Sequence, residues 1–354
     1  MSDNRYPKPL ENKSTYYLKE KSIHFGFAIL KTLLAFNVII SHCFKIKTTK
    51  NKFILFITKR RRIHVPSFVI MSFYFNYNML ISTDSKKKLI RFERLLIPYI
   101  GWPIIIYIFS NIFKFIKRFN RLCSFRILIL QLITAQGNGL LHFWYLLDLI
   151  LTTFIFHFII ITFRNNYIFV LNLLLLFSYF LQYSKYNRII HSYIRGIGVL
   201  ERENEIIPFA ISGFTLSALN ILEILSKHKI KTFIISLIIY NVTQDYQIFA
   251  NFYGVAYNGI KLNVISVCIV IIFSLIPLKK LRNKNMVNLL KYMTSYSGGI
   301  FYIHQAVQFY FKYLLTDIKN GTFLGIIFIY LISHLICIFG SLIFMNTKAR
   351  NLFS

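Results

Sequence analysis

Long apolar segments alternate with short polar ones along almost the whole chain. A transmembrane helix needs about 20 predominantly apolar residues, and ten segments come close to that length: 23–43, 63–82, 95–113, 140–163, 167–183, 205–225, 231–250, 261–278, 294–315 and 322–344. Helices are the expected element because lipid offers no partner for open backbone groups. The pattern therefore predicts an all-α polytopic membrane protein with about ten transmembrane helices.

The composition supports a membrane protein. With 354 residues, 56% hydrophobic content and a mean hydropathy of +0.54, the chain carries more apolar surface than a soluble domain of this length can bury. Residues 1–22 are polar and do not resemble a removable signal peptide. We therefore expect a cytoplasmic segment 1–22, a membrane domain 23–344 and a short tail 345–354. Both a plasma or inner membrane and a secretory-pathway membrane suit such a multi-pass protein.

The net charge of +30 does not indicate nucleic-acid binding, because the Lys and Arg residues fall in loops between the apolar segments. Contact with anionic membrane lipids is the expected consequence. The basic residues do not predict an orientation either, since alternate loops carry similar numbers of them. The loop 44–62 is the main exception to a regular bias. The four cysteines are scattered singly, so we predict no metal site.

The first apolar segment carries Lys31 and His42, eleven residues apart. This spacing is about three helical turns, so both side chains should lie on one face with about 16 Å between them. His42 suits a proton acceptor for an alcohol, because an unperturbed histidine has a pKa near 6.5. The alternatives are a histidine at the membrane interface and a lysine that extends toward the headgroups.

Other polar residues border or interrupt the apolar segments. Arg91 and Arg94 are three residues apart, so two guanidinium groups on one helical face can hold a phosphate. The alternative is a pair of arginines at a helix end, partly neutralised by Glu93. His64 begins the second segment, and His304 lies in the middle of the ninth, where an idle histidine is costly.

These residues belong to an ordered series of short motifs. Lys31 precedes LLAFNVIISH, which ends at His42; HVPSFVIMSFYF follows from His64, and RFERLLIPY begins at Arg91. Further along come HFWYL, IPFAISGF and GGIFYIHQ. In this order the motifs resemble the acyltransferase 3 family of integral-membrane enzymes, which includes O-acetyltransferases of polysaccharides. One departure is that the Ser-Gly pair of the family's second helix stands here as Ser72–Phe73, which is expected to change helix packing.

The resemblance implies an O-acyltransferase. It would move an acyl group, commonly acetyl, from acetyl-CoA or another acyl-CoA to a hydroxyl of a carbohydrate or glycolipid, with no permanently bound cofactor. In that chemistry His42 is the candidate base, His64 or His304 orients the base or binds the sugar, and three basic residues are candidates for acyl-donor binding: Lys31, Arg91 and Arg94. A transporter or flippase using the same His and Arg residues is the alternative.

Overall fold

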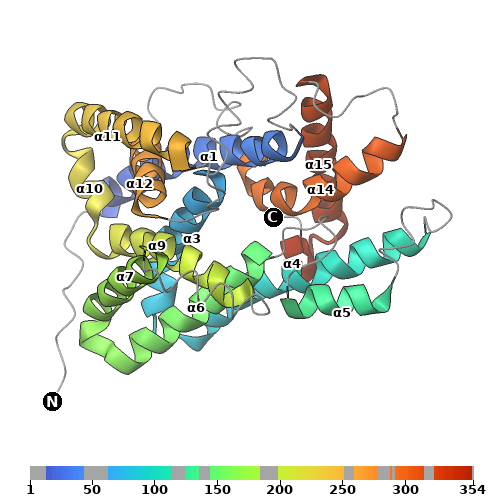
Figure 1. Ribbon diagram of the computed structural model, residues 1–354, viewed down its shortest axis with the longest axis horizontal. Coiled ribbons are helices and arrows are strands. Elements are labelled where there is room, and N and C mark those ends of the chain that lie inside the picture. The colour runs from blue at the N-terminus through green and yellow to red at the C-terminus, as the bar shows by residue number, and fades with distance from the viewer. Residues whose placement is uncertain are drawn as a thin grey trace.

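A computed structural model describes residues 13–43, 63–112, 124–134, 144–183, 198–250, 259–276, 288, 292–314 and 323–352. Helices make up the regular structure in these residues, and they contain no strand (Figure 1). The helices are α1 Lys13–Cys43, α3 His64–Ile81, α4 Ser85–Ile112, α5 Phe125–Thr134, α6 Trp144–Phe163, η4 Arg164–Asn166, α7 Tyr167–Tyr183, α9 Gly198–Ala218, α10 Ile221–Ser226, α11 Lys229–Ala250, α12 Ile260–Ser274, α14 Ser297–Leu314, α15 Phe323–Ile343 and η7 Lys348–Leu352. The predicted all-α class is confirmed for the described part of the chain.

Each of the ten predicted segments overlaps a helix, but several boundaries differ. The first helix begins at Lys13, so part of the segment 1–22 is helical. The helix that contains the third predicted segment, 95–113, is α4, which begins at Ser85. Arg91 and Arg94 therefore lie within this helix and not before its start. The sixth breaks at Asn220, whose φ of 51° is left-handed, and continues as α10. A polar residue that tolerates this conformation allows the chain to turn between the two helices.

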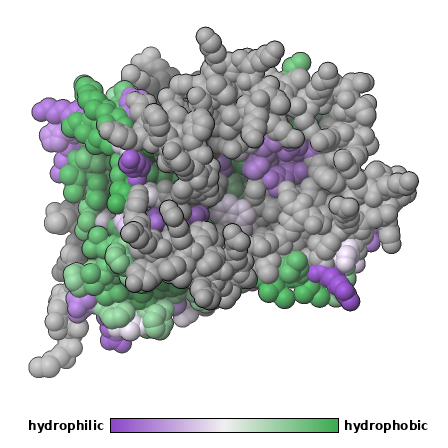
Figure 2. All heavy atoms as spheres, in the orientation of Figure 1, coloured by the Kyte–Doolittle hydropathy of each residue, from purple (hydrophilic) through white to green (hydrophobic). Residues whose placement is uncertain are grey.

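Four described stretches are long and apolar enough to cross a membrane: Phe25–His42, Ser85–Phe109, Trp144–Gln182 and Leu324–Ile343. The total of about ten spans therefore stays a prediction. The outward side chains suit lipid nonetheless. On α7, for example, Phe169, Leu176 and Phe180 are each more than 60% exposed. Figure 2 shows hydrophobic surface of this kind where the described residues reach the outside.

The helices around α1 pack closely. α1 contacts α3, α12, α14 and α15, and α3 lies against α9. Glycines make two of these approaches possible. A Cβ at Gly26 would lie 1.6 Å from the carbonyl oxygen of Phe273 in α12, and one at Gly213 of α9 would lie 2.1 Å from that of Ile70 in α3. Small residues at helix contacts let backbones approach in this way.

α14 runs parallel to α1. The hydroxyl of Thr294, just before α14, donates to the carbonyl of Ala28, and the amide of Gln308 donates to the carbonyl of His42. Both contacts join residues 266 positions apart, so α1 and α14 run in the same direction over this length. The His42 side chain meets α14 at His304, whereas the Lys31 side chain lies over Phe75 of α3.

Candidate functional site

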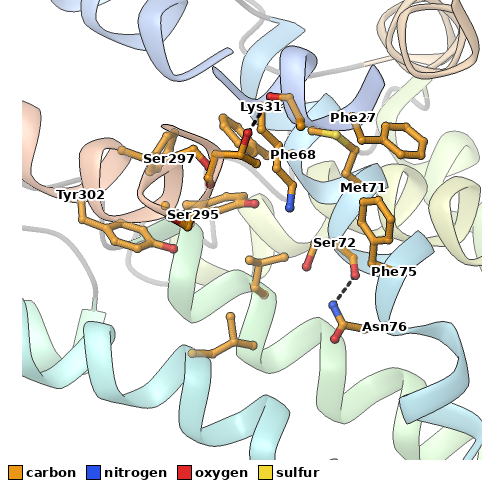
Figure 3. A pocket seen from close by; sticks show the side chains of 17 residues that line it. Phe27, Lys31, Phe68, Met71, Ser72, Phe75, Asn76, Ser295, Ser297 and Tyr302 are labelled. Atoms are coloured by element: carbon orange, nitrogen blue, oxygen red, sulfur yellow. Dashed lines mark hydrogen bonds between the residues drawn. The ribbon is translucent and has the colours of Figure 1, made fainter. Parts of the chain in front are cut away.

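A cavity of about 560 Å³ opens between α1, α3, α4, α6 and the start of α14. Aromatic and aliphatic side chains form much of its wall, including Phe27, Phe68 and Phe75. Hydroxyl and amide groups interrupt that wall at Ser72, Asn76, Thr294, Ser295 and Ser297 (Figure 3). The cavity thus combines a largely apolar surface with several groups that can hydrogen-bond a ligand, as small-molecule sites commonly do.

Lys31 supplies positive charge to this cavity. Its side chain leaves α1 and its ammonium group points into the open space between Ser295 and Ser72 (Figure 3). The Nζ atom lies 5.2 Å from the centre of the Phe75 ring, a distance that suits a cation–π interaction. No acidic side chain is among the described residues that line the cavity. An anionic ligand therefore fits this space better than a neutral or cationic one.

The serine and threonine hydroxyls of the wall are held by the backbone. Thr294 donates to Ala28, and Ser297 donates to the carbonyl of Thr294. On the opposite wall, the amide of Asn76 donates to the carbonyl of Ser72 at 2.7 Å. In this arrangement the hydroxyl oxygens offer lone pairs to the cavity, so they can accept hydrogen bonds from amide or hydroxyl groups of a ligand.

Arg91 lies behind the cavity wall. It is 4% exposed, its Nε donates to the hydroxyl of Thr153 at 3.2 Å, and its Nη1 lies 3.5 Å from the hydroxyl of Ser72. Its guanidinium also stacks over the ring of Phe73, 5.0 Å from the centroid. Its Nη2 has no hydrogen-bond partner among the described residues. The printed partners of this buried guanidinium are neutral hydroxyls and a ring, and one of them, Ser72, lines the cavity.

Arg94 does not join Arg91. Although the two residues are three apart on α4, Arg91 is buried whereas Arg94 is exposed. Positions three apart differ by about 60° around a helix, and on α4 the boundary between core and surface falls between them. The expectation that both guanidinium groups hold one phosphate is therefore wrong in its geometry. Glu93 does not neutralise the arginines either, because it pairs with Lys348 of η7 at 2.5 Å.

Two of the three predicted histidines lie together. The rings of His42 on α1 and His304 on α14 have centroids 5.3 Å apart. The side-chain amide of Gln305 contacts Nδ1 of His42 at 3.3 Å. His304 is 1% exposed, and its Nδ1 donates to the carbonyl of Ile300 at 3.1 Å. A neutral His304 therefore carries its proton on Nδ1 and has its lone pair on Nε2, the atom that can accept a proton.

The histidine pair adjoins the cavity through an aromatic partition. The ring of Phe301 lines the cavity and lies 6.3 Å from the ring of His304. On the other side Phe301 packs edge-on against Phe68 at 5.7 Å. The third predicted histidine, His64, is buried one helical turn before Phe68. His304 thus lies behind Phe301 and His42 lies beyond His304, and none of the three histidines is among the described residues that line the cavity.

Several residues of this site are not among those predicted from the sequence. Asn76, Ser295 and Ser297 line the cavity, and Gln305 contacts His42. Gln305 had a signal, because it stands beside His304 in the middle of an apolar segment, where polar groups are costly. The serines had none, since a hydroxyl in an apolar helix can bond its own backbone.

Comparison with known families gives the site its context. The acyltransferase 3 family, described as an acyltransferase domain, matches residues 25–343. The chain belongs to this family. A comparison with curated proteins gave no match, and neither did a comparison with solved structures. The match spans nearly the whole chain and every helix that contributes to the cavity, so the protein is an acyltransferase of the membrane type.

Phe73, which stands where the acyltransferase 3 pattern has glycine, fits into the packed interior of the helix bundle. Phe73 is fully buried, packs on Phe156 at 4.7 Å and lies beneath the guanidinium of Arg91. α3 also approaches α9 closely, at Gly213, which lies against the carbonyl of Ile70. The larger side chain therefore forms part of the support of Arg91, and Ser72 keeps its place in the cavity wall.

Proposed function

We propose that this acyltransferase transfers an acyl group, acetyl in the first instance, from a coenzyme A thioester to a hydroxyl of a carbohydrate or glycolipid. The observation that carries the proposal is the charge of the cavity: Lys31 points into it, Arg91 lies behind Ser72, and its described lining residues include no carboxylate. Coenzyme A is anionic through its phosphates, and its pantetheine arm has amides that hydroxyl oxygens can bind. These features support the cavity as the site of the donor.

The histidine pair supplies the acid–base chemistry in this proposal. The acceptor hydroxyl gives its proton to a histidine nitrogen as its oxygen attacks the thioester carbon. A carbon–oxygen bond forms and, as the tetrahedral intermediate collapses, the carbon–sulfur bond breaks. The proton then passes from the imidazolium to the departing thiolate, so the products are the ester and the free thiol of coenzyme A.

The positions of the two histidines suggest separate roles. His42 is half-buried and can meet a ligand, whereas His304 is almost fully buried. We therefore assign the attack to His42 as base and the support of its charge and orientation to His304. His64 stays a candidate for acceptor binding; it is buried one helical turn before Phe68, which lines the cavity.

Transfer of radiolabelled acetyl from acetyl-CoA to a glycan or lipid fraction tests the function. Membranes containing the wild-type protein should label the acceptor, and His42→Ala should lower the rate by about 100-fold or more, the range that general-base catalysis contributes. His228→Ala is the matched control, because His228 is exposed at the junction of α10 and α11. If no acyl donor or acceptor gives label with the wild type, the proposed acetyl transfer is wrong and a transporter or flippase becomes the better explanation of the site.

A further inference from the structure

A second hollow lies on a different side of the molecule, between α11 and α12. This groove has a volume of about 440 Å³. We call it the α11–α12 groove; its walls include Ile235, Ser236 and Ile239 of α11 and Val264, Val267 and Ile271 of α12. It shares no lining residue with the cavity at Lys31. The groove is therefore a separate hollow and not an extension of that cavity.

The groove opens toward the surroundings of the protein. Ile235 and Ile239 line it and are nevertheless 55% and 40% exposed. Their outward neighbours Ile234 and Ile238 are exposed as well. In Figure 2 the left of the view, where Figure 1 places α10 and α11, carries a continuous hydrophobic surface beside hydrophilic residues. In a membrane protein such an aliphatic surface faces lipid.

The polar groups at the floor of the groove are satisfied within the protein. The amide of Asn263 donates to the hydroxyl of Tyr179 at 2.6 Å and to that of Ser212 at 2.8 Å. The hydroxyl of Thr232 donates to the carbonyl of Leu225. A polar ligand would have to compete with these bonds, whereas a hydrocarbon chain requires none to be broken. The interior of the groove is therefore suited to an acyl chain.

One end of the groove is basic. Lys227, Lys229 and Lys231 are exposed at the end of α10 and in the first turn of α11, next to Thr232. Lys231 is four residues before Ile235, so its side chain lies above the groove wall on the same helical face. No acidic residue occurs between positions 224 and 243. A lysine cluster above an aliphatic groove matches an amphiphile with an anionic head.

We propose that the α11–α12 groove is a specific binding site for an anionic phospholipid, with an acyl chain against Ile235, Ser236 and Ile239 and the phosphate at Lys229 and Lys231. This site is independent of the proposed acyl transfer. It would hold α11 against α12 through a shared lipid and so stabilise the side of the bundle that lies away from the cavity.

Native mass spectrometry of the full chain in detergent tests this site with phosphatidylglycerol and phosphatidylcholine offered at equal concentration. The wild type should retain one phosphatidylglycerol in preference to phosphatidylcholine. Each lysine near a lipid headgroup contributes about fivefold in affinity, so Lys229→Gln/Lys231→Gln should weaken phosphatidylglycerol retention by about 25-fold. The matched control is Lys86→Gln/Lys87→Gln, which removes two exposed lysines from the first turn of α4 and should leave retention unchanged.

A third variant tests the acyl chain. Ser236 is 5% exposed and lines the groove, so Ser236→Phe should fill it and weaken retention of both lipids. Equal loss in the α11 and α4 lysine variants would overturn the proposal, because lysines in general would then bind the headgroup. Unchanged retention in Ser236→Phe would overturn the placement of the chain. A lipid-free dimer as the main species would show that a second copy covers the groove.

Discussion

The buried guanidinium of Arg91 gives the sharpest prediction of the account. Replacing Arg91 with Met removes the charge and keeps an unbranched side chain that can still pack on Phe73. The exposed neighbour Arg94, changed to Met in the same way, is the matched control. The two variants lose the same charge from the same helix and differ in where that charge stood.

The expected magnitude follows from the geometry. Nη1 of Arg91 lies 3.5 Å from the hydroxyl of Ser72, which lines the cavity. A ligand oxygen in contact with that hydroxyl is then about 6 Å from the guanidinium, and at an effective dielectric constant of about 20 two unit charges at this distance interact by about 3 kcal/mol. That energy corresponds to about 100-fold in kcat/KM. At Arg94 solvent screens the charge, so Arg94→Met should change the rate by less than about threefold.

Stability should move in the opposite direction from activity. A buried charge without a charged partner is costly, and replacing it with an apolar side chain of similar volume is often neutral or stabilising. The hydroxyl of Thr153 keeps its own bond to the carbonyl of Leu149 when Arg91 is removed. Arg91→Met should therefore unfold at a temperature equal to or above that of the wild type, although its rate of acetyl transfer is strongly reduced.

The assay is acetyl transfer at several acetyl-CoA concentrations by membranes with equal amounts of each variant, together with a thermal unfolding curve in detergent. A donor-binding role predicts that Arg91→Met raises KM for acetyl-CoA. A role of the Arg91 charge in donor binding is excluded if Arg91→Met transfers acetyl within about threefold of the wild type, or if Arg94→Met is impaired as severely.

Three further predictions follow from other contacts. Lys31→Met should raise KM for acetyl-CoA by about 10- to 100-fold, because its ammonium faces the cavity directly, and an unchanged KM would exclude the cavity as the donor site. Gln305→Glu places a carboxylate against Nδ1 of His42, whose ring also lies against that of His304; it should stabilise protonated His42 and move the pH of half-maximal transfer upward by about one unit. Gln308 donates to the backbone carbonyl of His42 and, among the described contacts, does not reach the imidazole, so Gln308→Glu is the control. Gly213→Ala should lower the unfolding temperature, since overpacking costs about 1–3 kcal/mol and the new Cβ would collide with the carbonyl of Ile70; an unchanged melting curve would mean that α3 and α9 can separate freely.

Helix positions and the relation between Lys31 and His42 were predictable from the sequence. Apolar length and helical periodicity determine them, and both are local properties. The structure adds that the two side chains have different neighbours, since Lys31 lies over Phe75 of α3 and His42 meets His304 of α14. The family was predictable too, because the order of the short motifs carries information that no single motif does.

The rest of the site depends on contacts between distant segments. Whether Arg91 or Arg94 is buried is decided by which neighbour covers α4, and the spacing of the two residues does not reveal that. Glu93 meets Lys348 across 255 positions, and Gln305 meets His42 across 263. The cavity draws its walls from five segments of the chain. Such groupings arise from tertiary packing and have no local signature.

A structure of the protein with a non-reactive thioether analogue of acetyl-CoA, determined by cryo-electron microscopy in nanodiscs, is the most direct test of the central claim. We expect density for the analogue in the cavity between Lys31 and Ser72, with its thioether sulfur at Phe301 and directed toward His42. Density for the analogue at another place, with the cavity at Lys31 empty, would contradict the account.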